Sequence, residues 1–440
     1  MEAGSVSSRL KDALHPLKGA TTDYDLLLER IGEARIVLLG EATHGTHEFY
    51  QARADISKRL IREKEFSVIA WEADWPDALR VNRFVRGEGR DASAREALDD
   101  FKRFPSWMWR NADVLDFVGW LRDENVQKPA NAIKTSVYGL DLYCLYASIE
   151  AVIEYLETVS PEAAGQARRR YGCFEDLGEN AETYGLLSAE FSCEAEVIEQ
   201  LVELQRRAGE FLGRDGRRAA DELFFAEQNA RVVKNAERYY RAMYHGGLDT
   251  WNLRDTHMAD TLDELMAHLE RQGERPKVIV WAHNSHLGDA RATDMSRRGE
   301  INLGQLLRER HGGDVRSVGF TTYTGTVAAA SKWDGPVQCQ RVRPALPESF
   351  ERRFHDSGER NFLLTLRNEP VEELEAPALE RAIGVIYKPA TERWSHYFES
   401  RLKEQFDAVI HFDETRAVEP MERRSEVAQT EPEETFPFGL

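Results

Sequence analysis

The sequence predicts an α/β fold: a three-layer α/β/α sandwich with a mainly parallel sheet and a large α-helical insertion. Three observations support this prediction. Short apolar runs, each ended by a glycine or a polar residue, are typical of parallel strands buried on both faces. A helical pattern separates the first two runs and makes a βαβ unit. Residues 147–271 then show almost no strand pattern.

The first predicted strand, 35–39, ends at Gly40. The helix that follows, 47–63, places apolar side chains at spacings of three and four, which one buried helix face requires. The strand 68–71 completes the βαβ unit. Further clear strands are predicted at 136–140, 277–282 and 315–320, and weaker ones at 361–366, 382–387 and 407–412.

The helical insertion is predicted at 147–271, because this segment is rich in Ala, Glu, Arg, Leu and Tyr with helical spacing. It divides the α/β core into a first part, 1–146, and a second part, 272–413. Internal turns of the insertion are expected at 213–216 and 245–249. The last residues, 414–440, are punctuated by proline and glutamate and are predicted to form a disordered tail.

The composition narrows the class of protein. A chain of 440 residues that is 42% hydrophobic can bury a large core. With 58 basic and 77 acidic residues its net charge is −19, which disfavours a dedicated nucleic-acid binder. No apolar run approaches the roughly 18–20 residues of a membrane span, and no secretory leader is visible. The cysteines show no disulfide-framework or CxxC spacing, so reduced thiols in a cytoplasmic protein are expected: Cys144, Cys173, Cys193 and Cys339.

Polar side chains follow each of the five clear strands. In open α/β sheets, ligands bind outside the carboxyl ends of the parallel strands. Because every one of these strands delivers acidic, imidazole or hydroxyl groups to that edge, we expect the active site there. The candidate residues are Glu41, His44, Glu72, Asp74, Asp141, His283, His286 and Tyr323.

The motif Gly-Glu-Ala-Thr-His-Gly at 40–45 carries the strongest signal. Its two glycines allow a sharp turn that brings Glu41 and His44 near one centre. A neutral histidine is available as a general base near neutral pH, and a carboxylate beside it can orient the ring and stabilise the imidazolium. The alternative is a helix-capping turn, in which a threonine caps the helix and His44 faces water.

Arg53 and Glu72 are expected to lie beside this turn. Arg53 lies on the following helix and can pair with a glutamate, bind a substrate carbonyl or form an ordinary surface ion pair. Glu72 follows an apolar strand between Trp71 and Trp75, so a desolvated carboxylate is expected there. It can carry protons, orient a histidine, or form a structural ion pair with Arg53.

The later histidines leave two alternatives open. His283 and His286, together with His44 and His47, make two HxxH pairs near acids, which would suit a metal ion. On loops this spacing does not guarantee convergence, and the helical HExxH signature is absent. Otherwise these histidines donate hydrogen bonds to an oxyanion or act as a second acid–base group.

Several common catalytic motifs are absent from the sequence. There is no GxSxG, GxGxxG or GxxxxGK[ST], and Ser285 is only a weak candidate nucleophile. Water activated by a histidine, without a covalent intermediate, is therefore the simplest hydrolytic mechanism.

Taken together, the motifs resemble the erythromycin esterase family, and the resemblance runs from about residue 26 to residue 412. It implies an α/β/α sandwich with a helical insertion and a site between the two. The antibiotic-resistance members of that family open a macrolide lactone with water. The matching stretches are 40–45 with Glu48 and Arg53, 71–72, 107–111, 228–231, 251–257, 281–286 and 394–398.

The resemblance also implies roles for single residues: His44 as the general base, Glu41 and Glu72 as the active-site glutamates, Arg53 as the arginine, and His283 and His286 as the later histidines. We expect a carboxylic ester hydrolase, with a macrolide lactone as one candidate substrate. Either Glu41 or Glu72 would orient His44. Arg53, with one of the later histidines, would stabilise the oxyanion.

Asp74, Asp141 and Tyr323 are expected to contact the substrate, and no cofactor or metal is expected. The predicted partner is a small-molecule ester, with no nucleic acid and no membrane; the oligomeric state is not predicted. Two alternatives remain open: a metal-dependent hydrolase at the same site, and a protein that binds a small molecule without turning it over.

Overall fold

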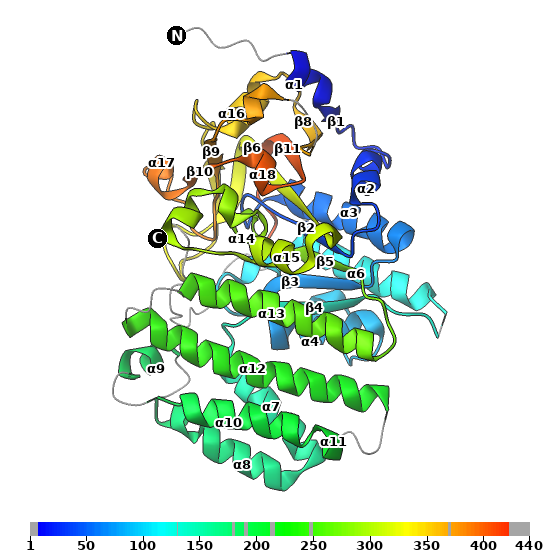
Figure 1. Ribbon diagram of the computed structural model, residues 1–440, viewed down its shortest axis with the longest axis vertical. Helices are drawn as coiled ribbons and strands as arrows, with labels where there is room; N and C mark the ends of the chain where they lie inside the picture. Colours follow the sequence, from blue (N-terminus) through cyan, green and yellow to red (C-terminus); the bar gives the residue numbers. More distant parts are fainter. Residues whose placement is uncertain are drawn as a thin grey trace.

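The structure is a computed structural model and describes residues 8–129, 131–177, 181–188, 192–211, 216–245, 250–367 and 371–421. Within them, the main sheet has the order β1-β8-β11-β6-β2-β5-β3-β4, with β7 paired to β6 (Figure 1). All neighbours from β11 across to β4 are parallel, and β1, β7 and β8 join antiparallel. The strands are β1 (His15–Pro16), β2 (Ile36–Leu39), β3 (Val68–Asp74), β4 (Ser136–Asp141), β5 (Val278–Trp281), β6 (Val315–Ala329), β7 (Gln338–Val342), β8 (Asn361–Thr365) and β11 (Ala408–Thr415), with β9 (Ala378–Arg381) and β10 (Tyr397–Ser400) in a separate pair.

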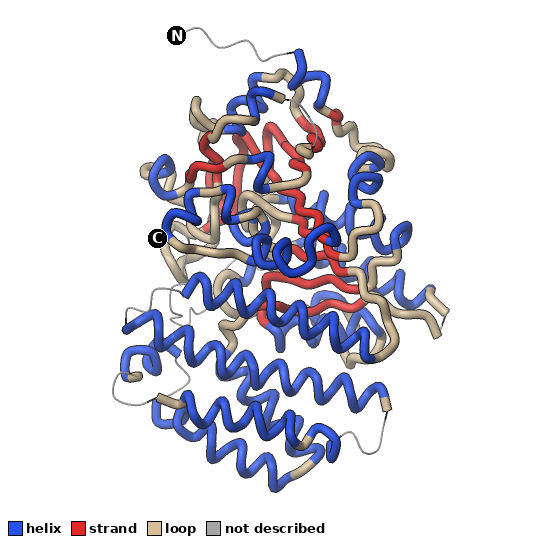
Figure 2. Tube along the Cα trace, viewed as in Figure 1, coloured by secondary structure: helices blue, strands red, loops and turns tan. Residues whose placement is uncertain are grey.

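Helices surround this sheet, so the predicted α/β/α fold class is confirmed (Figure 2). The helices of the α/β core are α1 (Ser8–Ala13), α2 (Asp25–Ile31), α3 (His47–Lys64), α4 (Trp75–Arg86), α5 (Ala94–Ala97), α6 (Ala112–Gln127), α14 (Asn284–Leu287), α15 (Leu303–His311), α16 (Phe350–Asp356), α17 (Glu392–Ser395) and α18 (Leu402–Gln405). The helices between β4 and β5 are α7 (Leu145–Val159), α8 (Pro161–Tyr171), α9 (Ala181–Leu187), α10 (Glu194–Arg206), α11 (Ala208–Phe211), α12 (Arg217–His245) and α13 (Thr250–Arg271).

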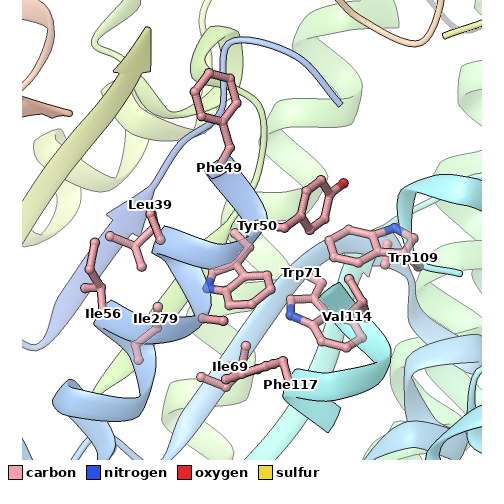
Figure 3. Packing of buried hydrophobic residues seen from close by; sticks show 14 of the residues in the cluster. Leu39, Phe49, Tyr50, Ile56, Ile69, Trp71, Trp109, Val114, Phe117 and Ile279 are labelled. Carbon is pink, nitrogen blue, oxygen red and sulfur yellow. The ribbon is translucent and has the colours of Figure 1, made fainter. Parts of the chain in front are cut away.

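The central strands β2 and β5 are apolar throughout because both faces of the sheet are covered there. Successive side chains of a strand point to opposite faces. On β2, Val37 and Leu39 belong to the apolar cluster formed with α3 and α6, whereas Ile36 and Leu38 belong to the cluster formed with α13 and α15. Figure 3 shows the first cluster, in which Leu39, Phe49, Ile56, Trp71, Phe117 and Ile279 pack together.

The segment predicted as the insertion, 147–271, contains the helices from α7 to α13 in its described part. Most of them share an apolar core of their own, to which α7, α8, α10 and α12 contribute. The helix α13 differs, because Met258, Leu262 and Leu265 pack against the sheet. It therefore connects the helical layer to the strands that carry the site. The internal turns predicted at 213–216 and 245–249 lie largely outside the described residues.

The strand predicted at 382–387 is not formed. Within this run, Ile383 makes one isolated bridge to Thr43, and Ile386 makes one to Ala330. The neighbouring strand β9 ends at Arg381. The apolar residues 382–387 are buried at the carboxyl edge of the sheet. Burial alone does not require a continuous ladder of hydrogen bonds to a neighbouring strand.

The predicted tail begins too early at residue 414. The strand β11 continues to Thr415, and the chain then pairs with two loops of the core. Val418 donates its backbone N–H to the carbonyl of Gly45, and Met421 donates to that of Arg110. Residues 422–440 lie outside the described part of the chain.

Two of the four cysteines are joined, contrary to the expectation of four reduced thiols. A disulfide links Cys173 to Cys193, while Cys144 and Cys339 are free. The bond connects two segments of the helical layer that lie 20 residues apart. Among the described residues, no helix is long and apolar enough to cross a membrane.

A buried carboxyl group away from the sheet edge predicts a pH effect on stability. Glu380 is fully buried and accepts a hydrogen bond from Ser400 Oγ at 2.8 Å. Burial raises its pKa to about 8, helped by the charge of Glu351 and opposed by the bond from Ser400. A group whose folded pKa is raised contributes stability that is complete below its unfolded pKa and is lost as the pH rises through the folded value.

We therefore expect the free energy of unfolding of the wild type to fall between pH 5 and pH 8 relative to Glu380→Gln, by about 1.4 kcal/mol per pH unit at most. Urea unfolding at pH 5, 6.5 and 8 measures this difference. Glu399→Gln, at a half-exposed neighbouring carboxylate, is the matched control. Parallel pH profiles of the wild type and Glu380→Gln would contradict the prediction.

Candidate active site

The turn after β2 brings Glu41, His44 and Arg53 into one buried chain of contacts. His44 Nδ1 lies 2.9 Å from Glu41 Oε1, and Arg53 Nη2 donates to Glu41 Oε2 at 2.8 Å. Because a carboxylate only accepts hydrogen bonds, Nδ1 carries the proton. This leaves Nε2 of His44 as the ring atom that can take up a proton. The helix-capping alternative is not formed, since His44 is buried and Thr46 makes no side-chain cap.

Glycines allow this turn to pack closely against its neighbours. A Cβ atom on Gly40 would collide with the side chain of Asn284, and one on Gly45 would collide with the backbone of Ala328. Neither glycine has a positive φ. The two glycines are therefore required by close approach and not by a left-handed backbone.

Arg53 lies behind the pair formed by Glu41 and His44. Its side chain is fully buried, with the guanidinium 4.2 Å from the centre of the Tyr50 ring and 4.9 Å from that of Trp281. It does not line the cavity described below. Its contacts hold Glu41 in place and neutralise the buried carboxylate.

A second buried network surrounds Glu72, at the end of β3. Arg254 Nη2 donates to Glu72 Oε1 at 2.8 Å and to Asp141 Oδ2 at 2.6 Å. The other oxygen of Glu72 accepts the backbone N–H of His283 at 2.8 Å. Glu72 therefore connects β3 with the end of β5, and Arg254 ties both to the helix α13.

His286 lies between two acids of this network. Its Nδ1 is 2.9 Å from Asp255 and its Nε2 is 3.1 Å from Glu72 Oε1. Its ring stacks on Trp251 with 4.4 Å between centroids. Burial lowers the pKa of His286, but the charges of Asp255 and Glu72 outweigh burial and raise it to about 9. His286 is therefore an imidazolium at neutral pH, with both ring N–H groups in use.

Two carboxylates of the network, Glu72 and Asp141, are ionised for the same reason. Burial raises the pKa of Glu72, but His286 and Arg254 together hold it well below its usual range. Burial likewise raises the pKa of Asp141, and Arg254 brings it below the ordinary value. Asp255 differs, because burial raises its pKa and the charge of His286 only partly opposes that rise.

His283 lies next to His44 and is neutral. The two rings are 4.8 Å apart between centroids. Burial, and then the nearby His44, hold the pKa of His283 well below its usual range. Its Nδ1 accepts the backbone N–H of Ser285 at 3.2 Å, so the ring proton is on Nε2. This Nε2 is buried and makes no hydrogen bond of good geometry, but the backbone of Ala42 is near enough to act as a weak acceptor and raise the pKa.

A cavity of about 450 Å³, its open mouth included, lies over these groups. His44, Glu72, Asp74, Asp141 and Arg254 form its polar part. The opposite part is mostly aromatic and apolar, with Phe101, Phe104, Pro105, Met108, Trp109 and Val385, together with Ala73, Asp77, Arg103 and Ser106.

The structure thus brings most of the candidate residues to one edge of the sheet. His44, Glu72, Asp74 and Asp141 line the cavity, and Glu41, Arg53, His283 and His286 lie directly behind it. Tyr323 does not line this cavity; its ring stacks on His355 at 3.7 Å. Asp74 is already engaged, because it accepts from Arg103 Nε at 3.0 Å and from the backbone of Tyr143 at 3.2 Å.

Arg254 and Asp255 are the site residues that sequence reasoning missed. They occupy the segment 251–257, which carried the family resemblance but followed no strand. The available signal was the position of two buried charged residues inside an apolar helix pattern. Charges of this kind are rarely buried without partners.

The sequence left open whether the histidines and acids of the site bind a metal ion. Among the described residues, no group of three or more His, Cys, Asp or Glu side chains has the arrangement to hold a metal ion.

The parallel sheet lies between layers of helices and has a buried histidine–glutamate dyad and a cavity at its carboxyl edge. These features are typical of an α/β protein with a site of the hydrolase type. The sequence model of one family, described as erythromycin esterase, matches residues 61–415. The chain belongs to the erythromycin esterase family, and the resemblance predicted from its motifs is confirmed.

Individual relatives are distant. Erythromycin esterase type II of Escherichia coli is 22% identical over 416 residues, which cover 90% of this chain and 93% of that protein. A Bacillus cereus protein of known structure has a TM-score of 0.78 and 22% identity, covering 93% of this chain and 97% of that chain. A mutant erythromycin esterase in its open conformation has a TM-score of 0.69 and 19% identity, covering 92% and 97%. These structural likenesses show the shared fold.

Proposed function

We propose that this protein hydrolyses a carboxylic ester by means of water activated by His44, without a covalent intermediate. The observation that carries the proposal is the chain Arg53–Glu41–His44 at the base of the cavity. In it, Glu41 fixes the tautomer that leaves Nε2 of His44 as a base. Glu41, rather than Glu72, is the glutamate in contact with His44.

The reaction proceeds in two steps. In the first, His44 Nε2 takes a proton from water while the water oxygen bonds to the ester carbon, and the carbonyl electrons move to the oxygen. In the second, the carbonyl re-forms and the bond to the alkoxide breaks. The alkoxide then takes the proton from His44, and the new carboxylic acid ionises.

His283 is the donor that we assign to the oxyanion, because it is neutral and its ring lies 4.8 Å from that of His44. A fixed donor aimed at developing charge lowers the barrier by a few kcal/mol. Arg53 and His286, the other residues expected in this role, lie behind the cavity lining as His283 does, but Arg53 bonds to Glu41 and His286 bonds to Glu72 and Asp255, so we assign these two to positioning.

A screen of simple esters and of macrolides, followed by mass spectrometry, tests the proposed function. We expect at least one ester to be converted to its acid and alcohol, or a lactone to gain one water, with a chelator present throughout. A chelator should not matter, because His286 and its acids already form mutual ion pairs. Binding without turnover across the screen would contradict the proposal.

The family relatives named for erythromycin make macrolide lactones the first substrates to test. A part in antibiotic resistance and a cytoplasmic location stay predictions. The disulfide between Cys173 and Cys193 bears on the location, because such bonds are rare in reducing compartments.

A further inference from the structure

One short loop contributes the largest share of the residues that line the cavity. Of the 15 lining residues in the described part of the chain, seven lie between 101 and 109, in the loop that joins α5 to α6. The helical insertion, 147–271, contributes Arg254 alone among those described residues, and this side chain is held by Glu72 and Asp141. A bound molecule would therefore meet more of the loop than of the insertion.

The loop is held in a defined shape at both ends. Arg110 Nη2 donates to Asp99 Oδ1 at 3.0 Å, which closes the loop on itself. Asn111 donates its side-chain N–H groups to the carbonyls of Trp107 and Met108, while its Oδ1 caps α6. Ordered hydrogen bonds of this kind hold a binding surface ready before a ligand arrives.

Contacts to the core and to the chain end fix the loop in place over the site. Arg103 Nε donates to Asp74 at 3.0 Å, at the end of β3. On the other side, the chain after β11 pairs with the loop, because Met421 donates to the carbonyl of Arg110. The same chain segment pairs with Gly45 in the turn of the proposed base. The chain segment after β11 therefore holds both the loop and the turn that carries His44.

The aromatic side chains of the loop differ in how much they depend on the core. Trp109 stacks on Trp71 of β3, with 4.8 Å between ring centroids (Figure 3). Phe101 lies against both rings. Phe104 instead packs on Trp107 and on the partly buried Trp333. Phe104 can therefore be changed with the least disturbance of the core.

We infer that the loop 101–109, and not the helical insertion, selects the substrate, and that it selects esters with an apolar chain or ring. This inference rests on the proposed function. The apolar group packs on Phe104 and Met108, while the ester bond lies toward His44. The 450 Å³ of this cavity includes its open mouth, and only about 30 Å³ of it admits the centre of a water-sized group, so an apolar chain or ring that enters must contact the loop closely.

A series of p-nitrophenyl esters from acetate to octanoate tests the inference. In the wild type we expect kcat/KM to rise with chain length, by up to about fourfold per buried methylene group. Phe104→Ala and Met108→Ala remove apolar surface, so the ratio of kcat/KM for octanoate to that for acetate should fall at least about fivefold.

Phe211→Ala is the matched control, because it makes the same truncation on α11 of the helical insertion, where Phe211 packs against the insertion core. We expect it to leave the octanoate-to-acetate ratio within about twofold of the wild type. Thermal unfolding of each variant checks that it is folded. The inference is overturned if the loop variants keep the wild-type ratio, or if Phe211→Ala shifts it as much as they do.

Binding to the unreactive His44→Gln variant separates this inference from the proposed reaction. The probe is 2-decanone, a ketone that has the shape of a medium-chain ester but cannot be hydrolysed. By titration calorimetry we expect it to bind His44→Gln, and to bind at least about fivefold more weakly when Phe104→Ala is added. If no ester is turned over but this difference is found, the proposed reaction fails and the loop assignment stands. Equal affinities, or no binding to either protein, would overturn the loop assignment.

Discussion

Replacing His44 by glutamine is expected to lower kcat/KM for the best ester substrate by about 10²–10⁴-fold, the usual contribution of a general base. A glutamine amide can still donate a hydrogen bond to Glu41, so the buried contact that His44 makes at 2.9 Å is retained. What is lost is the ring nitrogen that accepts a proton. Steady-state kinetics and urea unfolding of the same preparations measure the two effects separately.

His47→Gln is the matched control, since it makes the same change three residues away on the same turn. His47 pairs with Asp113, is partly exposed and does not line the cavity. It should keep most of the wild-type activity. A folded His44→Gln variant with near-wild-type turnover would remove His44 from the mechanism, and loss of activity in both variants would point to a disturbed turn.

Much of this site could be predicted because parallel strands deliver their carboxyl ends to one edge. Glu41 and His44 follow β2 directly in the sequence and Glu72 lies near the end of β3, so identifying the strands was enough to bring them together. The sequence left open which glutamate contacts His44. That choice depends on side-chain direction at the ends of two strands that are separated by β5, which a sequence pattern does not specify.

Arg254 could not be placed from the sequence for a different reason. It lies 113 residues after Asp141 and 182 after Glu72, near the start of the helix α13. Helical periodicity identifies a buried face but not its partner. The cavity loop was found only in part: its residues 107–109 carried the family resemblance, but the position of 101–109 depends on contacts such as that of Arg103 with Asp74.

The predicted boundaries of secondary-structure elements were wrong where side-chain burial and backbone pairing do not coincide. The apolar run 382–387 is buried without forming a strand, and its Val385 lines the cavity. Residues 414–421 are polar in pattern and yet ordered, because backbone hydrogen bonds to Gly45 and Arg110 hold them. Backbone pairing of this kind leaves little trace in composition.

Arg254→Met is expected to destabilise the protein by about 3–5 kcal/mol and to abolish most activity. Removing one partner of a buried ion network leaves the others uncompensated. Here Asp141 loses the guanidinium that bonds both its oxygens, and Glu72 keeps only His286 and the backbone N–H of His283. Urea unfolding at pH 7 measures the loss.

Arg231→Met provides the comparison, because it breaks an arginine–glutamate pair between α12 and α13 that is partly open to solvent. Such pairs contribute about 0–1 kcal/mol, so the variant should unfold within about 1 kcal/mol of the wild type. A similar loss in both variants would mean that the effect belongs to helix packing and not to the Glu72 network.

The pH dependence identifies the cause of the Arg254→Met defect. In the wild type, Arg254 and His286 hold the pKa of Glu72 low, and Arg254 lowers that of Asp141. A carboxylate with a depressed folded pKa contributes stability that is present above its unfolded pKa and is lost as the pH falls. The Arg254→Met variant lacks this contribution already at neutral pH. The difference between wild type and variant should therefore be full near pH 7 and shrink as the pH falls below about 4, where Glu72 and Asp141 of the wild type become protonated and no longer need a cation. Loss of an apolar or steric contact would give a pH-independent difference, and Arg254→Lys, which keeps the charge but not the two-pronged geometry, should fall between the two proteins at pH 7.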